Sequence, residues 1–173
     1  QLNGLGGTAH LHRLALGAKE GTIDLFLETE NNASTGNAVA HPGMAATSHE
    51  TRSSAPIQTL DHVAKEIGLS SCHLIKVDIE GAEYEFLKGG SSFLREHRPI
   101  LFGEFNPFWL RANGHRFADV ANLVLPWGYR LFGEDEKGGF SEVEQITDDL
   151  HDVLFLPRDL PASTVRILTR ADG

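Results

Sequence analysis

Hydrophobic and polar residues alternate along residues 22–28, with isoleucine and leucine on one side and acidic residues on the other. A period of two is typical of a β-strand that buries one face. Residues 9–16 are also rich in strand-forming types and end at a glycine-containing connector, residues 17–21. We therefore predict a pair of strands at the start of the chain.

Residues 30–56 show almost no periodicity and are rich in Asn, Ala, Ser, Thr, Gly and His. This pattern predicts a long loop. Loops of that length inside compact domains are usually functional or disordered. We predict that this segment is the most mobile part of the chain and that it borders the ligand pocket.

The rest of the chain switches between helical and strand patterns. Thr59 is a plausible N-cap, and Gly68 stands where a helix that starts there would end. Apolar runs predict strands at residues 74–79, 100–105, 129–132 and 153–156. Helical spacing predicts helices at residues 82–88, 92–96 and 117–124. Strands that alternate with helices are typical of βαβ units, so we predict an α/β fold with a mostly parallel sheet and helices on both faces.

Carboxylates stand at the ends of two predicted strands. Asp78 ends one apolar run and is followed by Glu80, and Glu104 ends the next run, two residues before Asn106. We expect the Asp78 strand to be central and parallel to the Glu104 strand. Ligands of such sheets bind outside the carboxyl ends of the strands, so Asp78, Glu104 and Asn106 are predicted to share one crevice, as ligands of a hard cation or as a general base. Alternatively, Asp78 hydrogen-bonds the following turn; Glu83 is predicted to be a surface residue that complements the helix dipole.

Composition narrows the class of protein. The chain has 173 residues, which suits a single domain over residues 1–173. Its formal net charge of −9 argues against tight binding to nucleic acid or to an anionic membrane. Cys72 is the single cysteine, so no intramolecular disulfide forms, and the histidines lack the spacing of a zinc site. We expect a cytoplasmic protein.

Residues 74–83, which read LIKVDIEGAE, resemble the hallmark Ile-Lys-x-Asp-x-Glu-Gly-x-Glu of the FkbM-type methyltransferases. The resemblance extends to the Thr-Leu-Asp helix start at residues 59–61, to the FLKGG run at residues 86–90 and to Glu104. It covers residues 9–106.

The resemblance implies a class I, S-adenosylmethionine-dependent methyltransferase with a Rossmann-like sheet, which methylates a hydroxyl oxygen of a small molecule or sugar. It places Ala15 and Leu16 near the adenine of the cofactor and Asp78 beside the methyl donor and acceptor. Glu80 and Glu104 line the acceptor side. Asp78, Glu80 and Glu104 are thus the catalytic candidates, and Ala15, Leu16 and Asp78 the cofactor-binding candidates. Methyl transfer needs an in-line acceptor oxygen that loses its proton to a base or is activated by a cation, so a divalent cation stays an open alternative.

The family begins with a strand, a glycine-rich turn and a helix that hold the methionine part of the cofactor, followed by a second strand. Residues 1–8 match none of these, and they lack an initiating Met, so we expect an N-terminally incomplete domain without the first two strands of the sheet. An incomplete sheet leaves dimerisation open. The competing hypothesis is a catalytically inert remnant that acts as a binding or interaction module. A carboxylate-based hydrolase or phosphotransferase is a third.

Overall fold

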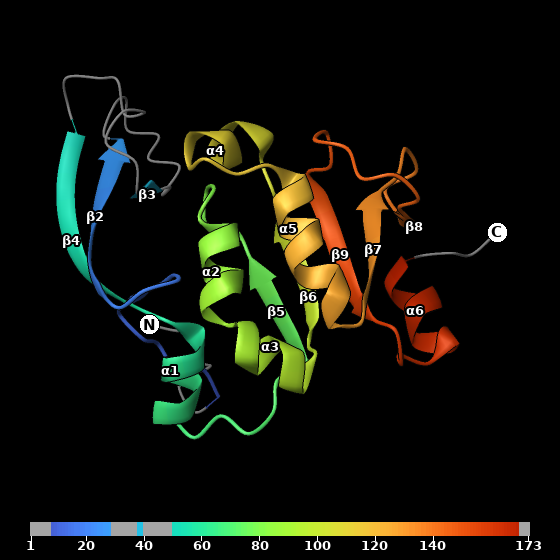
Figure 1. Cartoon of the computed structure of the whole chain (residues 1–173), viewed down its shortest axis with the longest axis horizontal. Helices are drawn as coiled ribbons and strands as arrows, with labels where there is room; N and C mark the ends of the chain where they lie inside the picture. Colours follow the sequence, from blue (N-terminus) through green and yellow to red (C-terminus); the bar gives the residue numbers. More distant parts are fainter. Residues whose placement is uncertain (1–7, 29–37, 40–49, 170–173) are drawn as a thin grey trace.

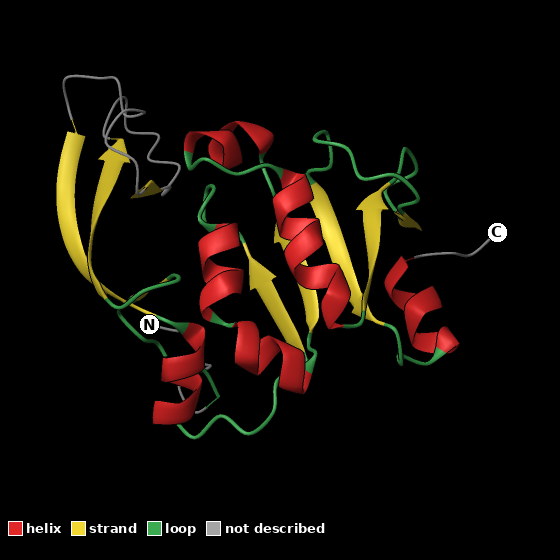
Figure 2. Ribbon diagram, in the orientation of Figure 1, coloured by secondary structure: helices red, strands yellow, loops and turns green. Residues whose placement is uncertain are grey.

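The computed structural model describes residues 8–28, 38–39 and 50–169, which form two β-sheets and six α-helices (Figures 1 and 2). The smaller sheet has the strand order β1-β4-β2-β3. Its strands are β1 (Ala15–Leu16), β2 (Gly21–Glu28), β3 (Ala38–Val39) and β4 (Glu50–Gln58). β2 pairs antiparallel with residues 50–57 of β4, and β1 pairs parallel with the end of β4.

The smaller sheet confirms the predicted strand at residues 22–28 and shortens the predicted strand at residues 9–16 to the two residues of β1. The predicted loop at residues 30–56 is wrong for β3 and for the part of β4 that it includes. β4 reads ETRSSAPIQ, so its side chains carry no hydrophobic alternation, and it is a strand because its backbone pairs with β2. The remainder of the predicted loop lies outside the described residues, and so does its predicted mobility.

The larger sheet has the strand order β5-β6-β9-β7-β8. Its strands are β5 (Leu74–Val77), β6 (Ile100–Glu104), β7 (Tyr129–Glu134), β8 (Phe140–Glu142) and β9 (Asp152–Pro157). β5 and β6 are parallel, as predicted, whereas β9 runs antiparallel to both β6 and β7.

Two predictions about this sheet are wrong. It is not mostly parallel, because β9 inserts between β6 and β7 and because a short turn joins β7 to β8 as an antiparallel hairpin. In the described part of the chain, β5 is an edge strand rather than a central one. The order of the strands depends on which neighbours bury β9, and the apolar run at residues 153–156 does not contain that information.

Helices cover both faces of the larger sheet. They are α1 (Leu60–Glu66), α2 (Glu83–Gly89), α3 (Ser91–His97), α4 (Pro107–Ala112), α5 (Phe117–Val124) and α6 (Ala162–Thr169), with a 3₁₀ turn, η2, at Leu125–Trp127. α2 and α5 lie on the near face in Figure 1 and enclose the main core with Val153 and Phe155 of β9. The alternate residues Leu154 and Leu156 face a second core that includes residues of α6. Strand alternation thus divides the apolar residues of β9 between two cores.

The predicted helix limits near α1 are confirmed. The Thr59 side chain accepts a hydrogen bond from the backbone N–H of His62 (3.1 Å), and Gly68 follows the helix with a φ of 67°. The helices predicted at residues 82–88, 92–96 and 117–124 correspond to α2, α3 and α5. Sequence analysis missed α4, α6 and β8.

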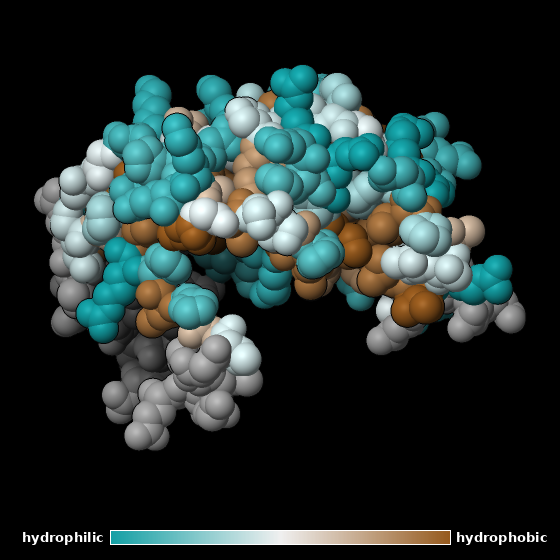
Figure 3. Space-filling view, turned by 90° about the horizontal axis from the view of Figure 1, so that it is seen from below, coloured by the Kyte–Doolittle hydropathy of each residue, from teal (hydrophilic) through white to brown (hydrophobic). Residues whose placement is uncertain are grey.

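The face of the larger sheet that carries the second core is less covered near β5 than near β9. Leu74 on β5 is 58% exposed, and Lys76 two residues later is also exposed. Figure 3 shows hydrophobic residues gathered along a hollowed side of the molecule.

The six helices of the described residues are all too short or too polar to span a lipid bilayer.

Candidate active site

Asp78 and Glu104 lie at the carboxyl ends of the two parallel strands. The last paired positions of β5 and β6 are Val77 and Gly103, and each carboxylate is the next residue along its strand. The parallel register therefore brings Asp78 and Glu104 to adjacent positions at one edge of the sheet. This is the convergence that the sequence predicts for these two residues.

Lys76 adds a positive charge to this edge. It lies two residues before Asp78 on the same side of the chain, and its Nζ donates a hydrogen bond to Asp78 Oδ2 (2.9 Å). This hydrogen bond, with the negative charges of Asp78, Glu104 and Asp152, raises the pKa of the Lys76 ammonium above its usual range. Sequence analysis missed Lys76, although a lysine and an aspartate at positions i and i+2 of a strand were a visible signal.

The start of β9 contributes two more polar side chains. Asp152 is the antiparallel partner of Glu104. His151 Nε2 lies 3.6 Å from Glu104 Oε1, and its Nδ1 lies 3.4 Å from Asp152 Oδ2. These contacts are ion pairs when the imidazole carries a proton. The sequence did not indicate them, because β9 reaches this edge only through its antiparallel insertion beside β6.

The turn between β5 and α2 has an unusual backbone. Glu80 has a φ of 51° and Gly81 a φ of 96°, so both lie in the left-handed region. A side chain at Gly81 would clash with the carbonyl oxygen of Trp109 in α4, so this position requires glycine. The turn is therefore packed tightly against α4.

Glu83 is buried, and the prediction that it is a surface residue is wrong. Only 1% of it is exposed. Its Oε1 accepts hydrogen bonds from the backbone N–H groups of Gly81 (3.0 Å) and Ile79 (3.2 Å). Burial raises the pKa of this carboxyl, against the opposing effect of the backbone donors. Glu83 thus makes the turn contacts that we considered as an alternative role for Asp78.

Asn106 caps α4. Its Oδ1 accepts a hydrogen bond from the backbone N–H of Phe108 (3.0 Å). Capping accounts for an amide side chain at this position. The amide oxygen of Asn106 is therefore already engaged in the helix cap.

Ala15 and Leu16 lie in the smaller sheet, away from the carboxylates. The next residue, Gly17, packs so closely against Gly89 at the carboxyl end of α2 that a side chain on Gly89 would clash with it. Asp78 and Glu80 precede the other end of α2, and a helix of seven residues is about 10 Å long. The structure does not bring Ala15 and Leu16 together with Asp78.

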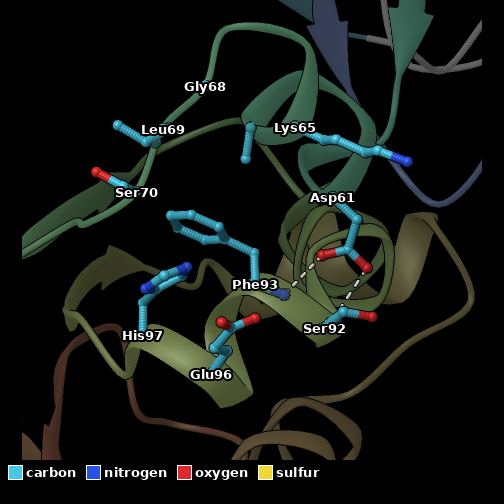
Figure 4. A pocket seen from close by; sticks show the side chains of 10 residues that line it. Asp61, Lys65, Gly68, Leu69, Ser70, Ser92, Phe93, Glu96 and His97 are labelled. Carbon is cyan, nitrogen blue, oxygen red and sulfur yellow. Dashed lines mark hydrogen bonds between the residues drawn. The ribbon is translucent and has the colours of Figure 1, made fainter.

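A shallow pocket of about 350 Å³ lies between α1 and α3 rather than at the carboxylates (Figure 4). Asp61 on its wall accepts hydrogen bonds from the backbone N–H groups of Ser92 (3.1 Å) and Phe93 (2.8 Å). Asp61 therefore holds the start of α3. Among residues 8–28, 38–39 and 50–169, no group of three or more His, Cys, Asp or Glu side chains is arranged to hold a metal ion.

A family model described as the Methyltransferase FkbM domain matches residues 3–131. The chain belongs to the FkbM methyltransferase domain family. The match includes the β5–α2 turn and Glu104 but ends before His151 and Asp152, so the family relationship covers the parallel strand ends and not the start of β9. Comparisons with curated proteins and with solved structures found no match.

Proposed function

We propose that this FkbM domain takes part in S-adenosylmethionine-dependent methylation of a hydroxyl oxygen on a small molecule or sugar. The observation that supports the proposal is that Asp78 and Glu104 directly follow the last paired residues of the parallel strands β5 and β6, inside the range that the family model matches. Ligands of open α/β sheets bind at this edge.

The charge of this edge fits the proposed cofactor. Asp78, Glu104 and Asp152 supply three carboxylates, against which Lys76 places one ammonium. S-adenosylmethionine carries a positive sulfonium beside its methyl group, and carboxylates favour a nearby cation. The side chains present therefore suit a cationic methyl donor.

The chain's own part in the reaction is to hold the acceptor and remove its proton. S-adenosylmethionine, when bound, would supply an electrophilic methyl group to the acceptor oxygen and leave as the neutral thioether. Lys76 holds Asp78 Oδ2, and no residue of the described part hydrogen-bonds to Oδ1. We assign Oδ1 to accept the hydroxyl proton and Glu104 to orient the acceptor.

A non-catalytic binding role is the second candidate. The position of β5 at the edge of the sheet in the described part favours it, because a strand on the far side of β5 would be needed to enclose a ligand there. We propose for either role a cytoplasmic protein with no nucleic-acid or membrane partner, in keeping with the net charge of −9.

Calorimetric titration with S-adenosylmethionine separates these functions when it is combined with an assay for S-adenosylhomocysteine release over a panel of sugars and phenols. Binding with acceptor-dependent release is the expected result. Binding without release from any acceptor would favour the binding role, and no binding would overturn the proposed function. The same assay with added Mg²⁺ or with a chelator tests the cation alternative.

A further inference from the structure

Glu83 is a buried acid in contact with the turn that carries two predicted catalytic residues. Its Oε1 binds the N–H groups of Ile79 and Gly81, which stand on either side of Glu80. Its Oε2 is also buried and has no hydrogen-bond partner. Burial of a carboxyl with one unsatisfied oxygen costs free energy of folding, and the hydrogen bonds of Oε1 with the turn are the contacts that offset this cost.

The turn needs such contacts, because its backbone is not relaxed. A residue with a side chain, such as Glu80, is disfavoured in the left-handed region. The hydrogen bonds from the residues before and after it hold that conformation from one side. On the other side, Gly81 lies against the backbone of α4.

The same turn sets the direction in which Asp78 and Glu80 leave the strand. Asp78 is the residue before Ile79, whose N–H binds Glu83. If that N–H loses its acceptor, the peptide unit that joins Asp78 to Ile79 is free to rotate. The carboxylate of Asp78 would then lose its fixed position beside Lys76 and Glu104.

We propose that Glu83 is a positioning residue, whose Oε1 clamps the turn at Ile79 and Gly81 and thereby fixes the carboxylates of Asp78 and Glu80 at the end of β5. Its consequence for catalysis rests on the proposed function. The clamp itself does not, so the two can fail separately.

Two substitutions at Glu83 separate the effect of its hydrogen-bond acceptor from the effect of its negative charge. Glu83→Ala removes the acceptor, and Glu83→Gln keeps a carbonyl oxygen that can accept both hydrogen bonds. Asp61→Ala is the matched control, because the Asp61 carboxylate also accepts hydrogen bonds from two backbone N–H groups, one on each oxygen (Figure 4). These N–H groups are at the start of α3, which follows the carboxyl end of α2, whereas the Glu83 turn precedes the amino end of α2. If Glu83→Ala does not fold, Glu83→Asp takes its place, since its shorter side chain cannot reach both N–H groups in the same position.

Nuclear magnetic resonance gives a readout that does not need turnover. In Glu83→Ala, we expect hydrogen exchange at the amides of Ile79 and Gly81 to rise at least about tenfold, because local opening no longer breaks a hydrogen bond. The carboxyl carbon signal of Asp78 should move as well. Glu83→Gln should restore both readouts, and Asp61→Ala should change exchange at Ser92 and Phe93 while leaving Asp78 unaffected.

Unchanged exchange in Glu83→Ala would overturn the proposal, as would a Glu83→Gln variant as open as Glu83→Ala or an Asp61→Ala variant that moves the Asp78 signal equally. Where the wild type transfers methyl groups, Glu83→Ala should lower kcat about tenfold or more with little change in KM for S-adenosylmethionine, and Glu83→Gln should recover it. A wild type without turnover contradicts the proposed function, and the exchange data then still decide the clamp.

Discussion

The edge strand β5 and the central strand β9 of the larger sheet have opposite chemistry. In β9, five of the six residues are buried. In β5 only Val77 is buried, and the exposed residues of this strand include Lys76. Phe155 of β9 contacts the rings of Phe105, Phe117 and Tyr129 at centroid distances of 6.1 to 6.4 Å. Stability is therefore concentrated around β9, and polar groups able to bind a ligand are concentrated at the end of β5 and β6.

This difference separates the effects of substitution. Changes around β9 should reduce the free energy of unfolding, and changes at the end of β5 should alter chemistry in a protein that stays folded. The start of β9 is the exception, because His151 and Asp152 place polar side chains of a stabilising strand beside Glu104.

Phe155→Ala should have the largest effect. Phe155 is fully buried, so its truncation leaves a cavity and should cost about 3–5 kcal/mol of the free energy of unfolding. Leu74→Ala on the exposed β5 is the control and should cost less than about 1 kcal/mol. Denaturant unfolding of both variants measures this, and equal losses would contradict the division of the sheet.

Asp78→Asn should leave stability nearly unchanged while it lowers turnover about 10²-fold or more, the usual scale for loss of a general base. The Lys76–Asp78 pair is exposed, so little stability depends on it. Asp159→Asn is the matched control, because it removes a similar exposed pair with Arg98 (2.7 Å) beyond the far end of β9. Single-turnover rates and melting temperatures of both variants provide the check; an unchanged rate per folded Asp78→Asn molecule would exclude Asp78 as the base.

Tyr129→Phe should have an intermediate effect on stability and none on the β5 end. The buried hydroxyl of Tyr129 donates to the carbonyl oxygen of Pro99 (2.8 Å), and burial raises the pKa of this phenol, so it stays protonated. Loss of the hydroxyl leaves that carbonyl unsatisfied and should cost about 1–3 kcal/mol. The exchange rate at Ile79 should not respond beyond the global change; a local increase there would show that the two regions are coupled.

The smallest expected effect is on pH dependence. The folded pKa of Glu83 lies above the ordinary value of 4.5, so the folded protein binds this proton more tightly than the unfolded chain. The resulting stabilisation is complete below the unfolded pKa and is lost as the pH rises through the folded pKa. The glutamine of Glu83→Gln cannot ionise. The stability of the wild type relative to this variant should therefore fall as the pH rises from the unfolded pKa of Glu83 through its folded pKa. Unfolding measured at several pH values tests this, and a parallel dependence of the two proteins would contradict it.

The candidate site was predictable in part because two of its features are local. Each carboxylate directly follows or ends an apolar run, and the helical residues between the two runs predict that the strands are parallel. The prediction that Asp78 and Glu104 lie at adjacent strand ends is therefore confirmed. The burial of Glu83 was not predictable. A glutamate in the first turn of a helix usually faces solvent, whereas this one is buried and binds the backbone N–H groups of the preceding turn.

The sequence by itself determined α1, α2, α3 and α5, the main strands of the larger sheet and the FkbM family, because periodicity, caps and a contiguous motif depend on neighbouring residues. The tertiary structure alone decided the order of the strands, the pairing of β4 with β2 and the arrival of His151 beside Glu104. Each of these depends on backbone hydrogen bonds and burial between segments far apart in the chain. Such contacts leave no period in the sequence, and a strand with little hydrophobic alternation, such as β4, becomes one only when its partner lies beside it.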